Sequence, residues 1–100
     1  ESLDGADVVY VKSWGALGRF GRPAEEVELR QGRRDWRMTE ARSHKLSSDG
    51  FVMHCLPVRR NIEIDDAVLD GPRSAVVDEA ENRLHVQRAL LIELIGDMSL

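Results

Sequence analysis

The chain has 100 residues, of which 42% are hydrophobic and 32% are charged, and its formal net charge is -4 at pH 7. This length suits one small folded domain and excludes two, and the composition is not that of a disordered segment. The acidic balance gives no electrostatic reason to expect nucleic acid or an anionic membrane surface as a partner. No apolar run approaches the roughly 20 residues that span a bilayer.

The single cysteine excludes an internal disulfide and cannot form a zinc site by itself. It fits a reducing compartment, and we expect a cytoplasmic protein. The first residue is not Met and no secretion signal follows it, so we expect the sequence to be part of a longer chain. Arginines are frequent in the second half, which makes a small anion a reasonable ligand; they are Arg59, Arg60, Arg73, Arg83 and Arg88.

Three short apolar runs predict β-strands, at residues 7–11, 51–55 and 74–77. A glycine-rich stretch over 15–21 predicts a loop, and Ser47-Ser48-Asp49-Gly50 predicts a turn.

Helical segments separate the predicted strands. Pro23 followed by two acids suits the first turn of a helix. Residues 34–46 have approximately helical apolar spacing, 65–69 begin a short helix that Asp70-Gly71-Pro72 ends, and 82–96 predict an amphipathic helix closed by Gly96. Strands that alternate with helices predict an α/β fold, a parallel sheet flanked by helices.

Polar clusters come at or just after the predicted strand ends: residues 12–14, 54–61 and 78–83. Ligands of open parallel sheets bind at the carboxyl ends of the strands, so these clusters predict the binding site. Composition alone indicates an anion site whose substrate stays open.

Three segments of the chain resemble the ornithine carbamoyltransferase family. Residues 51–57, which read Phe-Val-Met-His-Cys-Leu-Pro, are similar to the His-Cys-Leu-Pro strand end of that family. Residues 58–61 (Val-Arg-Arg-Asn) and 12–17 (Lys-Ser-Trp-Gly-Ala-Leu) resemble its N-acetylornithine branch, and 79–87 resemble that branch's last helix and its entry. The matches come in the family's order and at near-family spacing.

The resemblance implies a domain assignment for the whole chain. Residues 1–100 would form the C-terminal part of the acceptor-binding domain, which is the ornithine-binding domain of a carbamoyltransferase. Residues 82–96 would be the final helix, which crosses back toward a carbamoyl-phosphate domain absent from this sequence. The apolar face of that helix would then lack a partner. The full enzyme would be a homotrimer.

The family's reaction moves a carbamoyl group from carbamoyl phosphate to the side-chain amine of the acceptor and releases phosphate. The resemblance to the N-acetylornithine branch implies that the acceptor is N-acetylornithine and the product N-acetylcitrulline, in arginine biosynthesis. The reaction uses no metal, no cofactor and no covalent intermediate. Catalysis must therefore come from positioning the two substrates and from stabilising charge on the carbamoyl oxygen and the departing phosphate.

The resemblance gives roles to four residues. Cys55, Leu56 and Arg83 would be catalytic and would bind carbamoyl phosphate, and Lys12 and Leu56 would bind acetylornithine. The Leu56 carbonyl would accept a hydrogen bond from the amine, and a cis Leu56-Pro57 bond would turn it toward the ligand. Each residue also has a plainer reading: Cys55 as a small buried hydrophobe, Arg83 as a solvated helix residue and Lys12 as an exposed cation.

Three further residues would support the site without touching substrate: His54, Arg59 and Glu63. Arg59 is expected to point inward and Arg60 into solvent, because neighbours in extended chain face opposite ways. Some members of the acetylornithine branch carry a carbamate-modified lysine where this sequence has Glu63. Glu63 would then supply an anion to Lys12 or Arg59, whereas the alternative is an exposed member of an acidic stretch.

Two other functions stay open at this point. The first is a sibling enzyme that acts on N-succinylornithine or on ornithine, although Lys12-Ser13-Trp14 argues against the plain ornithine enzymes. The second is a non-catalytic fragment that binds a small anion.

Overall fold

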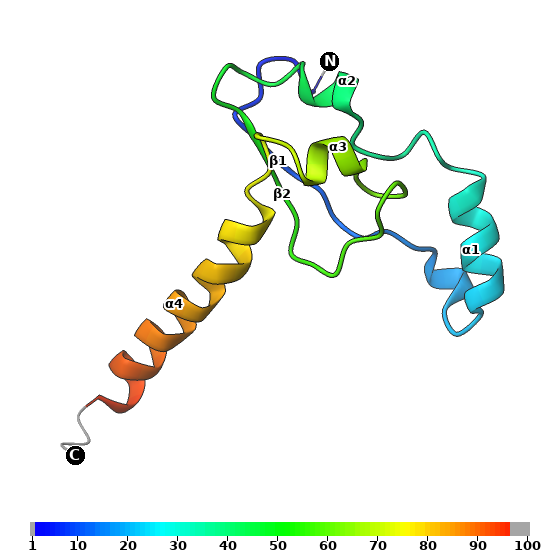
Figure 1. The fold of residues 1–100 in the computed structure, drawn as a ribbon. Helices are drawn as coiled ribbons and strands as arrows, with labels where there is room; N and C mark the ends of the chain where they lie inside the picture. Colours follow the sequence, from blue (N-terminus) through cyan, green and yellow to red (C-terminus); the bar gives the residue numbers. More distant parts are fainter. Residues whose placement is uncertain (1, 97–100) are drawn as a thin grey trace.

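The computed structural model describes residues 2–96, and its centre is a pair of parallel β-strands (Figure 1). β1 (Val8–Tyr10) pairs with β2 (Phe51–Met53), with Val9 opposite Val52 in the register. The pairing confirms the predicted α/β class with a parallel sheet. β1 is less buried than its β-branched sequence suggests, because Val8 and Tyr10 are each 48% exposed.

Within residues 2–96, one short 3-10 helix and four α-helices accompany the strands. They are η1 (Leu17–Arg19), α1 (Pro23–Gln31), α2 (Glu40–Ser43), α3 (Asp66–Leu69) and α4 (Val76–Ile95). Pro23 occupies the first turn of α1 as predicted, and Asp66–Leu69 confirms the short predicted helix. Among residues 2–96, every helix is too short or too polar to cross a membrane.

The predicted third strand at 74–77 is wrong. Ser74 forms a single parallel bridge with Val52, and the chain enters α4 at Val76. The helix therefore begins six residues before the predicted start at 82. Asp78 and Glu79 lie in its first turn, where acidic side chains interact favourably with the helix dipole, and this favours helix over continued strand.

The predicted helix over 34–46 is mostly wrong as well. Only Glu40–Ser43 is helical, because Thr39 caps the first turn by accepting a hydrogen bond from the Arg42 backbone N–H. Before that cap residues 34–37 form turns and bends, and Met38 forms a bridge with Ile64: the Met38 N–H donates to the Glu63 carbonyl, and the Asp65 N–H donates to the Met38 carbonyl.

The hydrophobic core is small and lies around β2. It consists of Met38, Leu46, Val52, Ile64 and Val68. Helix α4 extends away from this core (Figure 1), and only Val76 among its residues is buried. The radius of gyration is 17.5 Å, compared with about 13 Å for a compact chain of this length.

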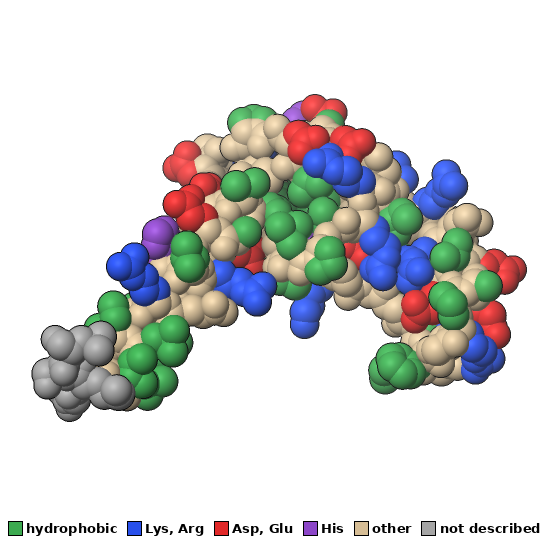
Figure 2. All heavy atoms as spheres, turned by 60° about the horizontal axis from the view of Figure 1, so that its bottom comes forward, with side chains coloured by type: hydrophobic (Ala, Val, Ile, Leu, Met, Phe, Trp, Pro, Cys, Tyr) green, Lys and Arg blue, Asp and Glu red, His purple; other side chains and the backbone are tan. Residues whose placement is uncertain are grey.

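Much apolar surface is consequently exposed, as the amphipathic pattern of residues 82–96 predicted. Figure 2 shows hydrophobic side chains gathered along the outer part of α4. Leu84, Leu91 and Leu94 of α4 are 66%, 56% and 77% exposed. At the η1 end of the molecule, Leu17 and Phe20 are 95% and 88% exposed.

The turn at Gly50 gives a direct test of this packing. A Cβ at Gly50 would lie 2.7 Å from Leu46 Cβ and 2.8 Å from the Ala6 carbonyl oxygen. Gly50→Ala is therefore expected to lower the free energy of unfolding by about 1–3 kcal/mol, measured by urea denaturation. Gly18→Ala is the matched control, because a Cβ there meets nothing within 4 Å. Equal stability of the two variants would contradict the packing at Gly50.

Candidate active site

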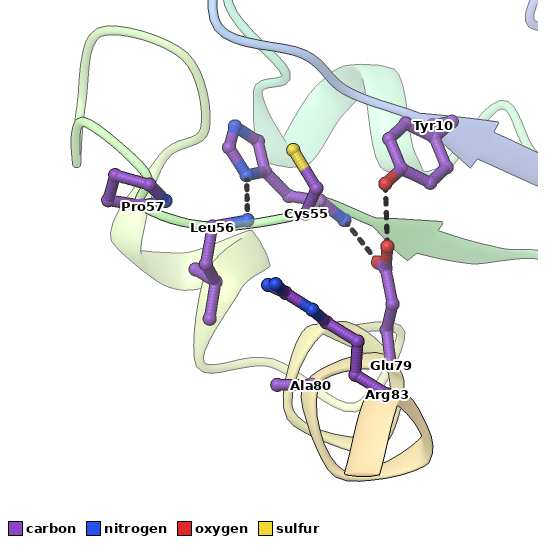
Figure 3. A pocket seen from close by; sticks show the side chains of 8 residues that line it. Tyr10, Cys55, Leu56, Pro57, Glu79, Ala80 and Arg83 are labelled. Atoms are coloured by element: carbon purple, nitrogen blue, oxygen red, sulfur yellow. Dashed lines mark hydrogen bonds between the residues drawn. The ribbon is translucent and has the colours of Figure 1, made fainter. Parts of the chain in front are cut away.

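A pocket of about 540 Å³ opens where β1 and β2 end and α4 begins (Figure 3). It brings together Cys55, Leu56 and Arg83, three residues that the sequence analysis assigned to one site. Residues from the ends of both strands and from the first turns of α4 complete the lining: Tyr10, His54, Pro57, Glu79 and Ala80.

The segment after β2 forms one side of the pocket. Cys55 is a free, exposed thiol, so the alternative reading of it as a buried hydrophobe is wrong. The peptide bond between Leu56 and Pro57 is cis, as expected. Leu56 has a positive φ of 53°, a conformation that a bulky residue seldom adopts and that commonly marks functional sites.

Arg83 reaches into this pocket from α4 (Figure 3). It lies about two turns past the helix start at Val76, so its charge does not oppose the helix dipole at the N-terminus. Within residues 2–96 the Arg83 guanidinium has no hydrogen bond or ion pair. Its five N–H donors are available to an anionic ligand.

Lys12 lies apart from this pocket. It lines a separate hollow of about 220 Å³ whose walls include Trp14, Trp36 and Glu63. Trp14 and Trp36 pack edge to face there, with ring centroids 5.3 Å apart. Leu56 does not line this hollow, so the two residues predicted to bind acetylornithine belong to different hollows.

Glu63 is a fully buried carboxylate with 0% exposure. The reading of Glu63 as an exposed acid is therefore wrong. Its Oε1 accepts a 2.7 Å hydrogen bond from Arg59 Nη1. Its Oε2 accepts from the Arg59 backbone N–H at 3.1 Å and from the Ser13 hydroxyl at 3.2 Å. Arg59, and not Lys12, is thus the cation paired with this anion.

His54 connects Glu63 to the pocket. The Leu56 backbone N–H donates to His54 Nδ1 at 2.9 Å, so Nδ1 carries no hydrogen. The ring hydrogen is therefore on Nε2, which donates to Glu63 Oε2 at 3.0 Å. Each ring nitrogen is used, and the ring is 1% exposed, which is the arrangement of a supporting residue.

Arg59 and Arg60 point different ways, as expected of neighbours in extended chain. Arg59 turns toward the buried Glu63, although its side chain is 44% exposed. Arg60 forms ion pairs with Asp66 and Asp70, each at 2.7 Å, on the surface. Hydrogen bonds from Arg60 hold the pKa of both of these carboxyls below the usual range.

Tyr10 was not among the residues that the sequence suggested for the site, and Glu79 was included only as a member of the 78–83 cluster, without a role of its own. Glu79 Oε1 accepts a 2.6 Å hydrogen bond from the Tyr10 hydroxyl, and Oε2 accepts a 3.0 Å bond from the His54 backbone N–H. The hydrogen bond to Glu79, partial desolvation, and the nearby Glu79 and Cys55 raise the pKa of Tyr10 to about 12. The spacing of Glu79 and Arg83, four residues apart on one helix, was the available signal.

Comparisons with known proteins show which family the chain resembles. The family profile described as aspartate/ornithine carbamoyltransferase, Asp/Orn binding domain, matches residues 1–94. The N-acetylornithine carbamoyltransferase of Xanthomonas campestris is 49% identical over 92 residues, which are 92% of this chain and 27% of that protein. An ornithine carbamoyltransferase of Syntrophus aciditrophicus is 46% identical over 95 residues, which are 95% of this chain and 30% of that protein.

Solved structures of this family superpose on the chain. An acetylornithine transcarbamylase complexed with acetylcitrulline matches with a TM-score of 0.77 and 46% identity over 94% of this chain and 28% of that one. The ornithine carbamoyltransferase from Pyrococcus furiosus matches with a TM-score of 0.80 and 36% identity over 98% of this chain and 30% of that one. The chain thus spans 30% or less of the length of these relatives.

The buried Glu63 predicts a specific dependence of stability on pH. Burial raises its pKa, but hydrogen bonds from the Arg59 backbone and side chain, Ser13 and His54 outweigh this and hold the pKa below its ordinary 4.5. The ionised carboxylate therefore stabilises the fold above pH 4.5, and this contribution is lost as the pH falls through the lowered pKa.

The free energy of unfolding, measured by urea denaturation between pH 7 and pH 3, is expected to fall more steeply for the unaltered chain than for Glu63→Gln. The difference isolates Glu63, because all other acidic groups are common to both chains. Glu28→Gln, at an exposed position, is the control and should keep the steeper slope. Parallel pH profiles for the unaltered chain and Glu63→Gln would show that folding does not lower the pKa of Glu63.

Proposed function

The chain belongs to the aspartate/ornithine carbamoyltransferase family, and we propose that it forms the acceptor-binding part of an enzyme that carbamoylates N-acetylornithine. The reaction takes the carbamoyl group from carbamoyl phosphate and releases phosphate and N-acetylcitrulline. The observation that carries the proposal is the meeting of Cys55, Leu56 and Arg83 in one pocket, where the Arg83 guanidinium has no hydrogen bond or ion pair with any other residue of 2–96.

The lining of the pocket can supply the two things that this transfer requires. Arg83 offers N–H donors to oxygens on which negative charge develops, either on the carbamoyl group or on the leaving phosphate. The neutral acceptor amine needs a hydrogen-bond acceptor that orients its lone pair toward the carbamoyl carbon, and the Leu56 carbonyl is proposed for that role. Cys55 is proposed to line the part of the pocket that binds carbamoyl phosphate.

Lys12 is proposed to bind the carboxylate of the acceptor. It is exposed, and within residues 2–96 it has no hydrogen bond or ion pair, so its charge is available to a ligand. Because Lys12 lines the neighbouring hollow and not the pocket itself, the acceptor would have to extend from Leu56 toward Trp14 and Trp36. Glu63 fixes both sides of this path, since it binds Ser13 as well as His54.

Ornithine is the second candidate acceptor, and a specific observation favours it. Ornithine carbamoyltransferases reach 46% identity, close to the 49% of the N-acetylornithine enzymes. The Lys12-Ser13-Trp14 segment favours the acetylated substrate, because it resembles the acetylornithine branch. N-succinylornithine is a third candidate, since a related N-acetyl-L-ornithine transcarbamylase variant was solved with carbamyl phosphate and N-succinyl-L-norvaline.

The acceptor is decided by steady-state kinetics of the complete enzyme that contains these residues. With carbamoyl phosphate saturating, N-acetylornithine is expected to give a kcat/KM at least about tenfold above that of ornithine or N-succinylornithine. A preference for ornithine or N-succinylornithine would replace the proposed substrate, and no turnover with any of the three would overturn the proposed reaction. The 100 residues alone are the control and are expected to produce no acetylcitrulline.

Arg83→Ala tests the proposed anion contact in the same enzyme. Loss of a charge-assisted hydrogen bond in a desolvated site is expected to cost about 2–4 kcal/mol in kcat/KM for carbamoyl phosphate. Arg88→Ala, at an exposed position farther along α4, is the matched control and should behave like wild type. Wild-type carbamoyl phosphate kinetics in Arg83→Ala would mean that Arg83 is an ordinary surface residue.

A further inference from the structure

The Glu79 carboxylate joins three elements at the edge of the pocket. Glu79 lies in the first turn of α4, Tyr10 is the last residue of β1, and His54 follows directly after β2. Each carboxylate oxygen is used once: Oε1 by the Tyr10 hydroxyl at 2.6 Å and Oε2 by the His54 N–H at 3.0 Å. Figure 3 shows Glu79 reaching from α4 to both strand ends.

Within residues 2–96, α4 is otherwise tied to β2 only at its entry, by the Ser74–Val52 bridge and a 2.9 Å hydrogen bond from the Ala75 N–H to the Val52 carbonyl. The helix has 20 residues, a length of about 30 Å, and only Val76 of these residues is buried. Its remaining turns extend away from the strands (Figure 1). The backbone pairing of residues 73–75 with Val52 holds the start of α4, and the two hydrogen bonds of Glu79 and the packing of Val76 hold its first turn.

The placement of Arg83 depends on the same anchor. Residues four apart on a helix lie on one face, so a helix face that is held by Glu79 also presents Arg83 to the pocket. Glu79 and Arg83 both line that pocket. Within residues 2–96 no hydrogen bond or ion pair holds the Arg83 guanidinium itself.

We infer that Glu79 is a positioning residue of the carbamoyl-transfer site, which ties α4 to the ends of β1 and β2 and so holds Arg83 over the pocket. This inference rests on the proposed function. Both carboxylate oxygens are already engaged by protein donors, so Glu79 acts through Arg83 and is not itself assigned a substrate contact.

The chemistry of the two donors predicts which substitutions are tolerated. A glutamine at position 79 can accept from the His54 N–H through its carbonyl oxygen and donate from its NH2 group to the Tyr10 oxygen, because a phenol both donates and accepts. Glu79→Gln should therefore keep the anchor. Glu79→Leu has a similar size and can make neither bond.

The anchor itself is tested in the chain as it stands, because Tyr10 is its only tyrosine. The ultraviolet absorbance of the phenolate then reports the ionisation of Tyr10 alone. At pH 11 Tyr10 should be mostly protonated in the unaltered chain, whose Tyr10 pKa is about 12, and mostly ionised in Glu79→Leu, where the pKa returns toward 10. Identical titrations in the two chains would overturn the Tyr10–Glu79 contact. Circular dichroism at pH 7 shows whether each variant is folded.

The positioning role is tested by carbamoyl transfer in the complete enzyme. Glu79→Leu is expected to raise the KM for carbamoyl phosphate about tenfold with a smaller change in kcat, and Glu79→Gln to stay within about twofold of wild type. In an Arg83→Ala background, Glu79→Leu should add little, because the residue that it positions is already gone. Tyr10→Phe, which removes one of the two donors, provides a second variant with the same expected direction.

Two results would overturn the inference: an equal effect of Glu79→Leu with and without Arg83, or failure of Glu79→Gln to retain activity while the variant is folded. The first would make Glu79 a purely structural residue, and the second would show that its charge is needed directly. If the wild-type enzyme shows no carbamoyl transfer at all, the proposed function fails, and the Tyr10 titration still decides whether Glu79 anchors α4.

Discussion

The arrangement of the pocket depends on one buried anion, the carboxylate of Glu63. It has no exposed surface and accepts hydrogen bonds from Ser13, in the segment after β1, and from His54 and Arg59, both in the segment after β2. Burying a carboxylate is costly unless it is paired and fully hydrogen-bonded. Moving any of these three donors away from Glu63 would therefore destabilise the fold. The segments after β1 and after β2 are consequently fixed to each other beyond the three-residue strands that carry them.

A second carboxylate has a related task on the other side of the strand ends. Glu63 holds the ring of His54 and, through His54 Nδ1, the backbone of Leu56, whereas Glu79 holds the backbone of His54 and the hydroxyl of Tyr10. His54 is therefore bound from both sides, which explains why it is buried in a region of otherwise exposed residues. The unusual backbone at Leu56 begins from this fixed point.

Local signals in the sequence predicted local structure. Pro23, the acids after it, and the Asp65–Gly71 segment each carry their own helix or turn chemistry, and the structure follows them. The wrong predictions fall where contacts with residues far away in the sequence determine the local structure. Residues 74–77 look like a strand, but only Ser74 reaches β2, and Val76 enters the helix that Glu79 anchors from afar. Met38 likewise pairs with Ile64 instead of joining a helix. The spacing of apolar residues within a short segment does not indicate which distant residues that segment will contact.

The site residues that could be predicted are those that belong to contiguous sequence motifs. Cys55 and Leu56 are neighbours, and Arg83 came with a recognisable helix entry, so their meeting was anticipated. The contact between Tyr10 and Glu79, which are 69 residues apart, was not anticipated.

The charges that line the pocket also indicate which further groups a bound phosphate would require. A phosphate group presents two negative charges and three acceptor oxygens, yet Arg83 is the only Lys or Arg among the described residues that line this pocket. The Arg83 guanidinium can bind two oxygens at once. The Glu79 carboxylate in the same lining repels a second anion. A carbamoyl phosphate bound here would require further cationic or N–H donors facing the open side of the pocket.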